Sequence, residues 1–239
     1  MCGRYVVTSP LDVLRQRFGF GGEVPDYRPR YNLAPRQPAP TVVDREGRVV
    51  VMMTWGLVPS WTRELAKAPR PINVRAETAQ GLASFRGPFQ RGRVLVPATG
   101  FFEWRGAKGT KERAPVLFRL RDGEPFAFAG LSDRWQAPEG TVLETFAILT
   151  VPPNDLVGAV HDRMPAILSR EDEARWLDPM TPSERARPLL APHPAEEMEA
   201  FEVGRAVNSP ASDRPDLIIP HRAGPIDSKT DAPGFPDGL

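Results

Sequence analysis

The chain has 239 residues, with 28 prolines, 20 glycines and a single cysteine. This length fits one domain, and the hydrophobic share of 41%, with 12 Phe and 5 Trp, suffices for a core. The high Pro and Gly content predicts a compact domain rich in loops. One cysteine excludes an internal disulfide and a multi-cysteine zinc site. The N-terminal residues lack an apolar stretch long enough for a signal peptide or a membrane span, so we expect a cytoplasmic monomer that does not contact membranes.

The near-neutral total charge hides an asymmetry between the two halves of the chain. Residues 1–110 carry 17 Lys and Arg against 8 Asp and Glu, whereas residues 111–239 carry 14 against 22. Of the 31 basic residues 27 are arginines, whose planar fork suits phosphate and carboxylate oxygens. A basic face that binds nucleic acid is one interpretation, and an ordinary solvated surface is the other.

The first predicted element is a helix with Ser9 as its N-cap, Pro10 in its first turn and Gly19 at its end. After it the pattern is mostly β, because short apolar runs recur between Gly and Pro residues. These predicted strands are Val49–Trp55, Val94–Pro97, Gly100–Trp104, Val116–Leu120, Phe126–Leu131 and Phe146–Val151.

Two helices are expected after the strands. One spans Asn154–Val160, and the other is capped by Ser169 and continues to Leu177 with acidic residues in its first turn. The fold class is therefore α+β, with a mainly β, mixed or barrel-like sheet and a few flanking helices in a single domain over residues 2–220. The composition shifts from about Pro210, and residues 221–239 are expected to form a flexible tail.

Cys2 stands out for its position. A small residue at position 2 permits removal of Met1, which would leave an α-amine and a thiol on adjacent carbons. The α-amine titrates near pH 8 and the thiol near 8.5, so both are partly nucleophilic at neutral pH. Toward an aldehyde, the amine forms an imine and the thiol then closes a five-membered thiazolidine ring. A lone cysteine near a terminus is otherwise commonly incidental.

Six separated motifs give Cys2 a context. They are MCGRY at the start, RYNLAP at 30–35, WGLVPSW at 55–61, INVRAET at 72–78, VPATGFFEW at 96–104 and HDRMP at 161–165. In this order they resemble the SOS-response-associated peptidase family, the abasic-site processing proteins. The resemblance runs from Cys2 to about Pro220 and implies a covalent cross-link between the N-terminal cysteine and abasic sites in single-stranded DNA.

The resemblance also implies catalytic roles for Cys2, Asn73, Glu103 and His161. Cys2 would capture the ring-opened deoxyribose, and Asn73 would orient the sugar hydroxyl or the Cys2 backbone. Glu103 lies in an apolar strand, where burial would raise its pKa for proton transfer, although strand alternation also allows it to face solvent. His161 has a pKa suited to proton delivery during ring opening, adduct reversal or β-elimination. Each of these residues also has a structural interpretation, such as a turn-capping Asn or a core His.

The DNA contacts are inferred from the same motifs. Three arginines match basic positions and are expected to hold phosphates, Thr150 and Asn32 to add neutral hydrogen bonds, and Trp61 with Pro35 to stack on bases or wedge at a single-strand/duplex junction. The arginines are Arg4, Arg75 and Arg163. Thr62 follows Trp61 where relatives often carry a second aromatic residue, which predicts weaker stacking. The alternative interpretation of each of these residues is that it packs in the core.

Two other classes of function remain open at this point. Cys2, His161 and Asn73 also suit a cysteine hydrolase, and the peptidase in the family's name is best understood as self-removal of Met1. The basic first half of the chain and the Glu among the site residues favour DNA chemistry over a general protease. A non-catalytic binder of single-stranded DNA is the third class. The sequence has no CxxC, HxH or HExxH, so we expect no metal and no cofactor. If the protein engages damaged DNA, it is expected to associate with the nucleoid.

Overall fold

The computed structural model describes residues 2–24, 26–106 and 113–221. Within these residues, five strands of mixed direction close into a barrel, because β10 pairs with both β4 and β9 while β3 and β6 complete the ring. The barrel strands are β3 (Pro38–Asp44), β4 (Arg48–Trp55), β6 (Arg93–Ala98), β9 (Phe126–Gln136) and β10 (Val142–Val151). Two short strands add to β10, namely β5 (Asn73–Arg75) and β11 (Met164–Pro165).

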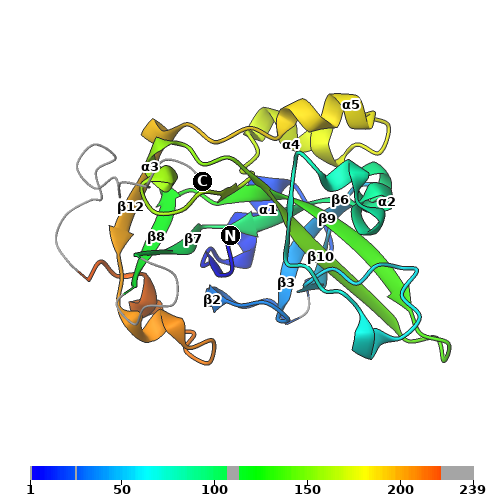
Figure 1. Cartoon of the computed structure of the whole chain (residues 1–239), viewed down its shortest axis with the longest axis horizontal. Helices are drawn as coiled ribbons and strands as arrows, with labels where there is room; N and C mark the ends of the chain where they lie inside the picture. The colour runs from blue at the N-terminus through cyan, green and yellow to red at the C-terminus, as the bar shows by residue number, and fades with distance from the viewer. Residues whose placement is uncertain (1, 25, 107–112, 222–239) are drawn as a thin grey trace, which may run out of the picture.

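A second, antiparallel sheet lies beside the barrel (Figure 1). Its strand order is β12-β8-β7-β1-β2. Its strands are β1 (Tyr5–Val7), β2 (Arg30–Leu33), β7 (Gly100–Arg105), β8 (Ala114–Leu120) and β12 (Met198–Glu202). The prediction of a mainly β, barrel-like α+β fold is confirmed.

All six predicted strands are present, each inside a strand of the structure. The sequence analysis did not predict the remaining strands. Five of them have only two to five residues, and the sixth, β3, contains prolines. β3 begins at Pro38 and contains Pro40, and proline disfavours a strand interior because it lacks an N–H. Short segments such as β5 carry too few residues to show a period of two.

The helices are short and flank the sheets. They are α1 (Leu11–Phe18), α2 (Ala83–Arg91), α3 (Asp155–Gly158), α4 (Arg170–Leu177) and α5 (Ser183–Ala186). Single 3-10 turns lie at Leu65–Lys67, Ala79–Gly81, Arg187–Leu189, Ala195–Glu197, Arg205–Asn208 and Pro215–Ile218. The sequence missed α2 because Gly87 and Pro88 lie inside it, and both residues disfavour helix interiors.

Two of the three predicted helix-end residues are confirmed. Gly19 ends α1 in the left-handed conformation with φ 66°, and its N–H donates to Arg15 O at 2.9 Å. Ser169 caps α4 by accepting from the N–H of Asp172 at 3.2 Å. The predicted helix Asn154–Val160 is present but shorter, because Asn154 is the N-cap of α3 and the helix ends at Gly158. Ser9 was wrong as a cap, because α1 begins one residue later than a Ser9 cap requires and its N-cap is Pro10.

The N-terminal segment lies near the middle of the molecule in Figure 1, where β1 is an inner strand of the antiparallel sheet. β1 pairs with β2 on one side and with β7 on the other. Its Tyr5 ring makes edge contacts with Trp55 and Phe128 of the barrel, at centroid distances of 5.1 and 5.7 Å. The start of the chain is therefore held by strand pairing in the antiparallel sheet and by packing of Tyr5 on the barrel, whereas most chain ends are poorly ordered.

The last described segment packs on the antiparallel sheet. Val207 and Leu217 are buried against Val6 and Phe102, and Val203 forms a β-bridge with Pro220. Residues 222–239, which make up nearly all of the predicted flexible tail, lie outside the described residues. The proposed boundary at residue 220 thus stays a prediction.

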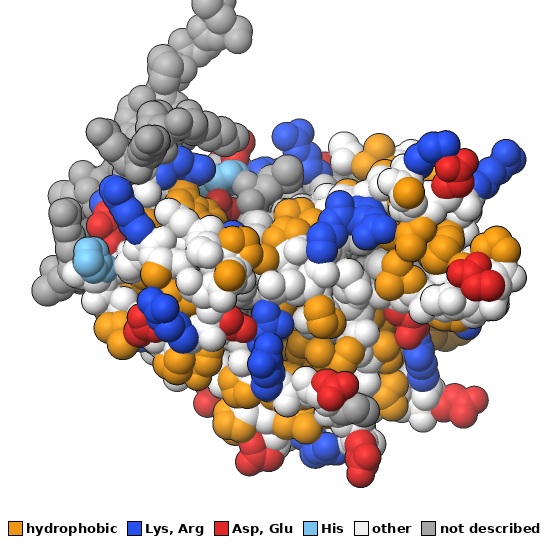
Figure 2. Space-filling view, turned by 90° about the horizontal axis from the view of Figure 1, so that it is seen from below, with side chains coloured by type: hydrophobic (Ala, Val, Ile, Leu, Met, Phe, Trp, Pro, Cys, Tyr) orange, Lys and Arg blue, Asp and Glu red, His pale blue; other side chains and the backbone are white. Residues whose placement is uncertain are grey.

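One face of the molecule, shown in Figure 2, carries a group of Lys and Arg side chains near its middle, with acidic side chains along its lower edge. Among the described residues, no helix is long and apolar enough to cross a membrane.

Candidate active site at the N-terminus

Cys2 lies just before β1 and is fully buried. Its Sγ is 3.6 Å from the carbonyl oxygen of Arg4, to which it donates a weak hydrogen bond. Burial raises the pKa of the Cys2 thiol well above its usual range, and the negative charge of Glu103 raises this pKa further. The thiol is therefore neutral at physiological pH in the chain that still carries Met1.

Asn73 holds the Cys2 backbone. It is the first residue of β5, which pairs in parallel with β10 in the register Asn73↔Ile148. Its Nδ2 donates to the carbonyl oxygen of Cys2 at 2.6 Å. Its Oδ1 is buried and accepts no hydrogen bond from the described part of the chain. Asn73 thus fixes one peptide group with its amide nitrogen and presents an acceptor beside it.

Glu103 is buried in β7, with only 3% of its surface exposed. Strand alternation places it on the same face as Phe101, which belongs to the main core, while Phe102 packs into the smaller cluster on the other face. Both faces of β7 are covered, so the solvent-facing alternative for Glu103 is wrong. Burial raises the pKa of the Glu103 carboxyl from 4.5 to about 7. This value is close to the operating pH, as general acid–base catalysis requires.

His161 faces Glu103 from the loop after α3. Its Nε2 lies 3.9 Å from Glu103 Oε2, and its ring is 7% exposed. The other ring nitrogen, Nδ1, accepts from the N–H of Arg163 at 3.0 Å and also lies 3.0 Å from Oδ1 of Asp162. Nδ1 therefore has both a donor and an acceptor beside it, so the ring can be held in either tautomer or as the cation. The geometry suits a group that exchanges protons with Glu103.

Asp162 was missed in the sequence analysis, although it stands inside the HDRMP motif. Its carboxylate contacts the His161 ring that precedes it. A carboxylate beside an imidazole favours the imidazolium, so Asp162 is placed to orient the His161 ring, although 69% of its own side chain is exposed. Direct adjacency in the motif was the signal that could have identified it.

The four catalytic candidates therefore come together from four separate segments. Cys2 precedes β1, Asn73 begins β5, Glu103 lies in β7, and His161 follows α3. β1 and β7 are neighbours in the antiparallel sheet, and β5 lies beside β10. The contacts are Asn73 with Cys2 and Glu103 with His161, and the Glu103 charge acts on the Cys2 thiol.

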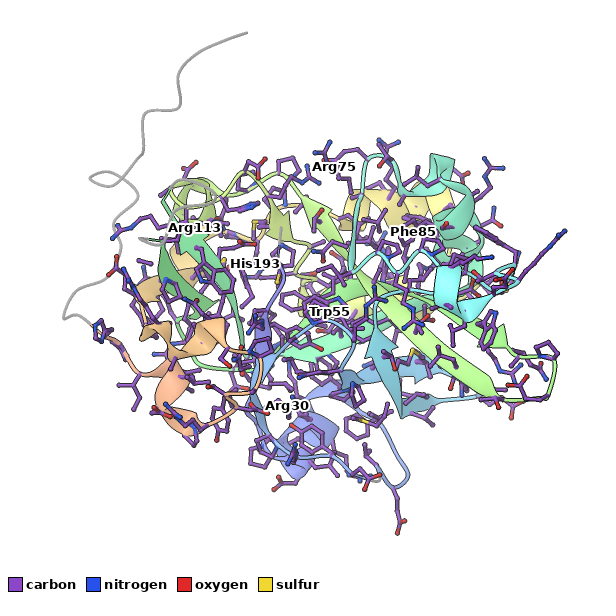
Figure 3. All side chains as sticks on the ribbon, turned by 60° about the horizontal axis from the view of Figure 1, so that its bottom comes forward. Arg30, Trp55, Arg75, Phe85, Arg113 and His193 are labelled. Carbon is purple, nitrogen blue, oxygen red and sulfur yellow. The ribbon has the colours of Figure 1, made fainter. Side chains whose placement is uncertain are left out.

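Of the predicted DNA contacts, Arg75 is the most available. It ends β5, two residues after Asn73, and its side chain is exposed. Figure 3 shows Arg75 at the upper edge of the view, whereas Trp55 lies near the centre of the molecule. Arg75 thus lies at the surface, at the end of the strand that begins with Asn73.

Arg163 is already paired within the protein. Its Nη1 and Nη2 donate to the two carboxylate oxygens of Glu77 at 2.8 and 2.9 Å, and Nη2 also donates to the carbonyl of Thr150 at 2.5 Å. The hydrogen bonds from Arg163 lower the pKa of Glu77. Thr150 itself is fully buried, and its Oγ1 donates to Val74 O at 3.4 Å. In this conformation Thr150 has no exposed atom to offer to DNA.

Asn32 is also unsuited to a direct DNA contact. It is fully buried, and its Nδ2 donates to the carbonyls of Val207, Ser209 and Ser212 at 3.2, 3.0 and 2.7 Å. Its Oδ1 accepts from Arg4 Nη1 at 2.8 Å. The expected hydrogen bond from Asn32 to DNA is therefore corrected: the side chain anchors the C-terminal segment on β2. Sequence reasoning missed this role because the partners lie about 175 to 180 residues away.

Arg4 shares this anchoring role, since its Nη1 also donates to Val207 O at 2.9 Å. Its guanidinium is half-buried, and burial lowers its pKa. Trp61 differs, because 59% of its side chain is exposed in the loop after β4. The core-packing alternative is wrong for Trp61. Pro35 is half-buried in the turn after β2.

The loop that carries Trp61 is tied to the barrel on both sides of this residue. The N–H of Val58 donates to Thr145 Oγ1 at 2.8 Å, and the Trp135 indole donates to the carbonyl of Thr62 at 2.7 Å. An exposed indole on a fixed loop is suited to stacking, because little conformational freedom is lost on binding.

The fold and site define a protein with a buried, strand-anchored cysteine at position 2, beside an amide, a carboxylate and an imidazole. The chain belongs to the SOS response associated peptidase (SRAP) family, whose sequence profile matches residues 1–210. The predicted family resemblance is therefore confirmed.

Named relatives and solved structures agree with this assignment. The chain is 39% identical over 225 residues to the abasic site processing protein YoqW of Bacillus subtilis, covering 92% of this chain and all of that protein. It is 32% identical to the abasic site processing protein HMCES of Gallus gallus, covering 83% of this chain and 68% of that protein. A crystal structure of a protein from Bacteroides thetaiotaomicron matches with a TM-score of 0.82 and 29% identity, covering 92% of this chain and 99% of that one.

Proposed function

We propose that this protein recognises abasic sites in single-stranded DNA and, once Met1 has been removed, forms a covalent cross-link to them through Cys2. The observation that carries the proposal is the Cys2 environment, in which Asn73 holds the carbonyl and Glu103 faces His161 nearby. The relatives named as abasic site processing proteins support the substrate class.

The chemistry balances without a cofactor. The α-amine of Cys2 attacks the aldehyde carbon C1′ of the opened sugar, and the resulting carbinolamine loses one water to give an imine. The Sγ–C1′ bond then forms, the thiol proton ends on the nitrogen, and a thiazolidine results. The net change is the joining of protein and DNA with the loss of one water.

Glu103 is proposed as the proton acceptor for the attacking amine. Its pKa of about 7 lies just below the usual range of an α-amine, so it can take a proton from the ammonium form and return it in the dehydration step. His161 is proposed to deliver a proton to the ring oxygen of the sugar during opening. His161 Nε2 lies 3.9 Å from Glu103 Oε2, so the two groups are placed to exchange protons during these steps.

A general cysteine hydrolase is disfavoured by the thiol itself. Such enzymes need a thiolate, and their nucleophiles have a lowered pKa. Burial and Glu103 instead raise the pKa of Cys2. A neutral thiol suits addition to an imine after the amine has reacted. Self-removal of Met1, if it occurs, would be a single event that precedes this chemistry.

The test incubates the protein with single-stranded DNA that carries one abasic site and then runs a denaturing gel. Wild type trimmed of Met1, as verified by intact mass, is expected to give a heat-stable adduct. Cys2→Ala is expected to give none, because no thiol closes the ring. Cys2→Ser is the matched control, because serine is nearest to cysteine in size and shape and, like alanine, keeps the α-amine without a thiol.

Cys2→Ser is expected to give an adduct only when borohydride reduces the imine. DNA with a tetrahydrofuran abasic analogue, which has no aldehyde, serves as the substrate control. Absence of an adduct from correctly trimmed wild type would refute the proposal. In that case salt-sensitive binding that survives Cys2→Ala would favour the non-catalytic DNA binder.

A further inference from the structure

Arg36 adopts a backbone conformation that is rare for its residue type. It follows Pro35 in the turn after β2 and has φ 73°, in the left-handed region that favours glycine. Its N–H donates to Trp55 O at 2.8 Å, which fixes this conformation. Strained backbone of this kind persists where the surrounding structure requires it, and it is enriched at functional sites.

The Arg36 side chain lies across Gly56. A Cβ atom at Gly56 would stand 3.2 Å from Arg36 Nη1 and 3.4 Å from the carbonyl oxygen of Arg70. Gly56 has φ 125°, so its own conformation also excludes a side chain. The absence of a side chain at Gly56 therefore leaves room for the Arg36 guanidinium on the same side as the Arg70 backbone carbonyl.

The two arginines lack a counter-charge. Within the described residues, neither Arg36 nor Arg70 forms an ion pair, and the side-chain hydrogen bond of Arg70 is to the neutral carbonyl of Leu65 at 3.3 Å. Burial lowers the pKa of the Arg36 guanidinium, and the positive charge of Arg70 lowers it further. Two cations held close together without a carboxylate repel each other, and an anion that binds between them relieves this repulsion.

Arg70 lies close in the chain to Asn73, and Arg36 and the Arg70 carbonyl lie beside Gly56, at the base of the loop that carries Trp61. Arg70 precedes Asn73 by three residues, so their Cα atoms are at most roughly 11 Å apart. The N–H of Leu57 donates to Pro71 O at 3.0 Å, which joins the two ends of the loop that carries Trp61. The two arginines therefore lie near the base of this loop and near Asn73, which binds Cys2, so a DNA strand bound at Cys2 is within their reach.

We propose that Arg36 and Arg70 form a phosphate subsite for the DNA backbone next to the abasic nucleotide. This inference deepens the proposed function and rests on it for the substrate class. Arginine forks bind phosphate oxygens in pairs, and a phosphodiester is the anion that single-stranded DNA supplies at this position. The strained turn at Arg36 then has a function: it aims a guanidinium that a relaxed backbone at this turn would direct elsewhere.

The experiment measures non-covalent binding to an undamaged single-stranded oligonucleotide by fluorescence anisotropy, at several salt concentrations. Each phosphate contact contributes about 0.7 to the slope of log K against log salt for single strands. Arg36→Gly and Arg70→Gln are each expected to reduce the slope by about 0.7, and the double variant by about 1.4. Arg185→Gln, at an exposed position on α5 (Ser183–Ala186), is the matched control and is expected to leave the slope unchanged.

Arg36→Gly also separates recognition from stability. Glycine accepts a positive φ, so the melting temperature is expected to stay the same or rise while DNA binding weakens. An unchanged slope in the double variant, or an equal fall in Arg185→Gln, would overturn the subsite. Because the oligonucleotide contains no aldehyde, this outcome is independent of cross-linking. A reduced slope without any cross-link in wild type would keep the subsite and refute the Cys2 chemistry instead.

Discussion

The buried site around Cys2 (the interior) and the exposed surface that carries Trp61 and Arg75 (the rim) differ in how they are built. Cys2, Glu103 and His161 are buried, come from separate segments, and owe their unusual titration or orientation to burial and to each other. Trp61 and Arg75 are exposed and lie on one continuous stretch of chain between β4 and the end of β5. The interior can tune protons because water is excluded, and the rim can bind a charged polymer because its groups remain accessible.

The largest effect on the interior is expected from Glu103→Gln. Losing a general acid–base group costs about a hundredfold or more in rate, so cross-linking should slow by about that factor. In wild type the rate should rise with pH through an inflection near 7, the pKa of Glu103, and this inflection should be absent in the variant. Single-turnover cross-linking from pH 5 to 9 measures both. An inflection near 7 that persists in Glu103→Gln would assign it to another group.

The same substitution predicts a pH-dependent gain in stability. The folded carboxyl has its pKa raised from 4.5 to about 7, so the folded state binds this proton more tightly than the unfolded state. Wild-type stability therefore falls as pH rises from 4.5 to about 7, by about 3 kcal/mol from this group. Gln stays neutral, so the melting temperature of Glu103→Gln minus that of wild type should increase across this range. A constant difference would contradict the burial argument.

Asn32→Ala tests whether the Asn32 side chain stabilises the folded protein or contacts DNA. The variant removes the hydrogen bonds of Asn32 to three carbonyls of the C-terminal segment and to Arg4, so we expect a loss of about 2 kcal/mol in the free energy of unfolding. Chemical denaturation measures this loss. Because Asn32 is buried, the salt dependence of DNA binding should not change at temperatures where the variant is folded. A reduced salt slope with normal stability would restore Asn32 as a DNA contact.

On the rim, Trp61→Ala is expected to weaken binding to single-stranded DNA by about tenfold. Stacking of a base on an aromatic side chain contributes about 1–3 kcal/mol, and the indole is 59% exposed, so little folding energy should be lost. Anisotropy titrations measure the affinity, and Trp61→Phe is the control that keeps an aromatic face. If Trp61→Phe binds as weakly as Trp61→Ala, stacking is not the contribution of this residue.

The smallest effects are expected for substitutions of Arg75 and Arg163, which should differ in how much they change the salt dependence of DNA binding. Arg75→Gln should reduce the salt slope of binding by about 0.7, because its side chain is exposed. Arg163→Gln should reduce it less, because Arg163 is already paired with Glu77 and is therefore not free to neutralise a DNA phosphate. Salt titrations of both variants check the order. A larger effect for Arg163 would mean that its pair with Glu77 opens on DNA.

The sequence predicted the strands and the motif residues well where the information is local. The six predicted strands are apolar runs of four to seven residues, and the caps Asn154 and Ser169 act within one turn of the chain. Prediction of strands and helices from the sequence failed where the local signal is weak or conflicting. Pro40 in β3 and Pro88 in α2 argue against elements that tertiary packing nevertheless stabilises.

The site was predicted unevenly for a related physical reason. The motifs indicated Cys2, Asn73, Glu103 and His161, but residue type alone did not decide whether Glu103 faces solvent, because that depends on what covers both sides of β7. The role of Asn32 depends on carbonyls near the other end of the chain. Arg36 carries no sequence signal, since its left-handed backbone and its approach to Gly56 exist only in the folded chain.

The central claim is that both nucleophilic groups of Cys2 become bonded to one carbon of the abasic sugar. The most direct measurement is the intact mass of the purified protein–DNA adduct, followed by alkylation of the denatured adduct with iodoacetamide. A thiazolidine predicts the mass of the chain without Met1 plus that of the DNA, minus one water, and no alkylation, since the only thiol is consumed. An adduct that retains Met1, or one whose thiol is alkylated in full, would contradict the account.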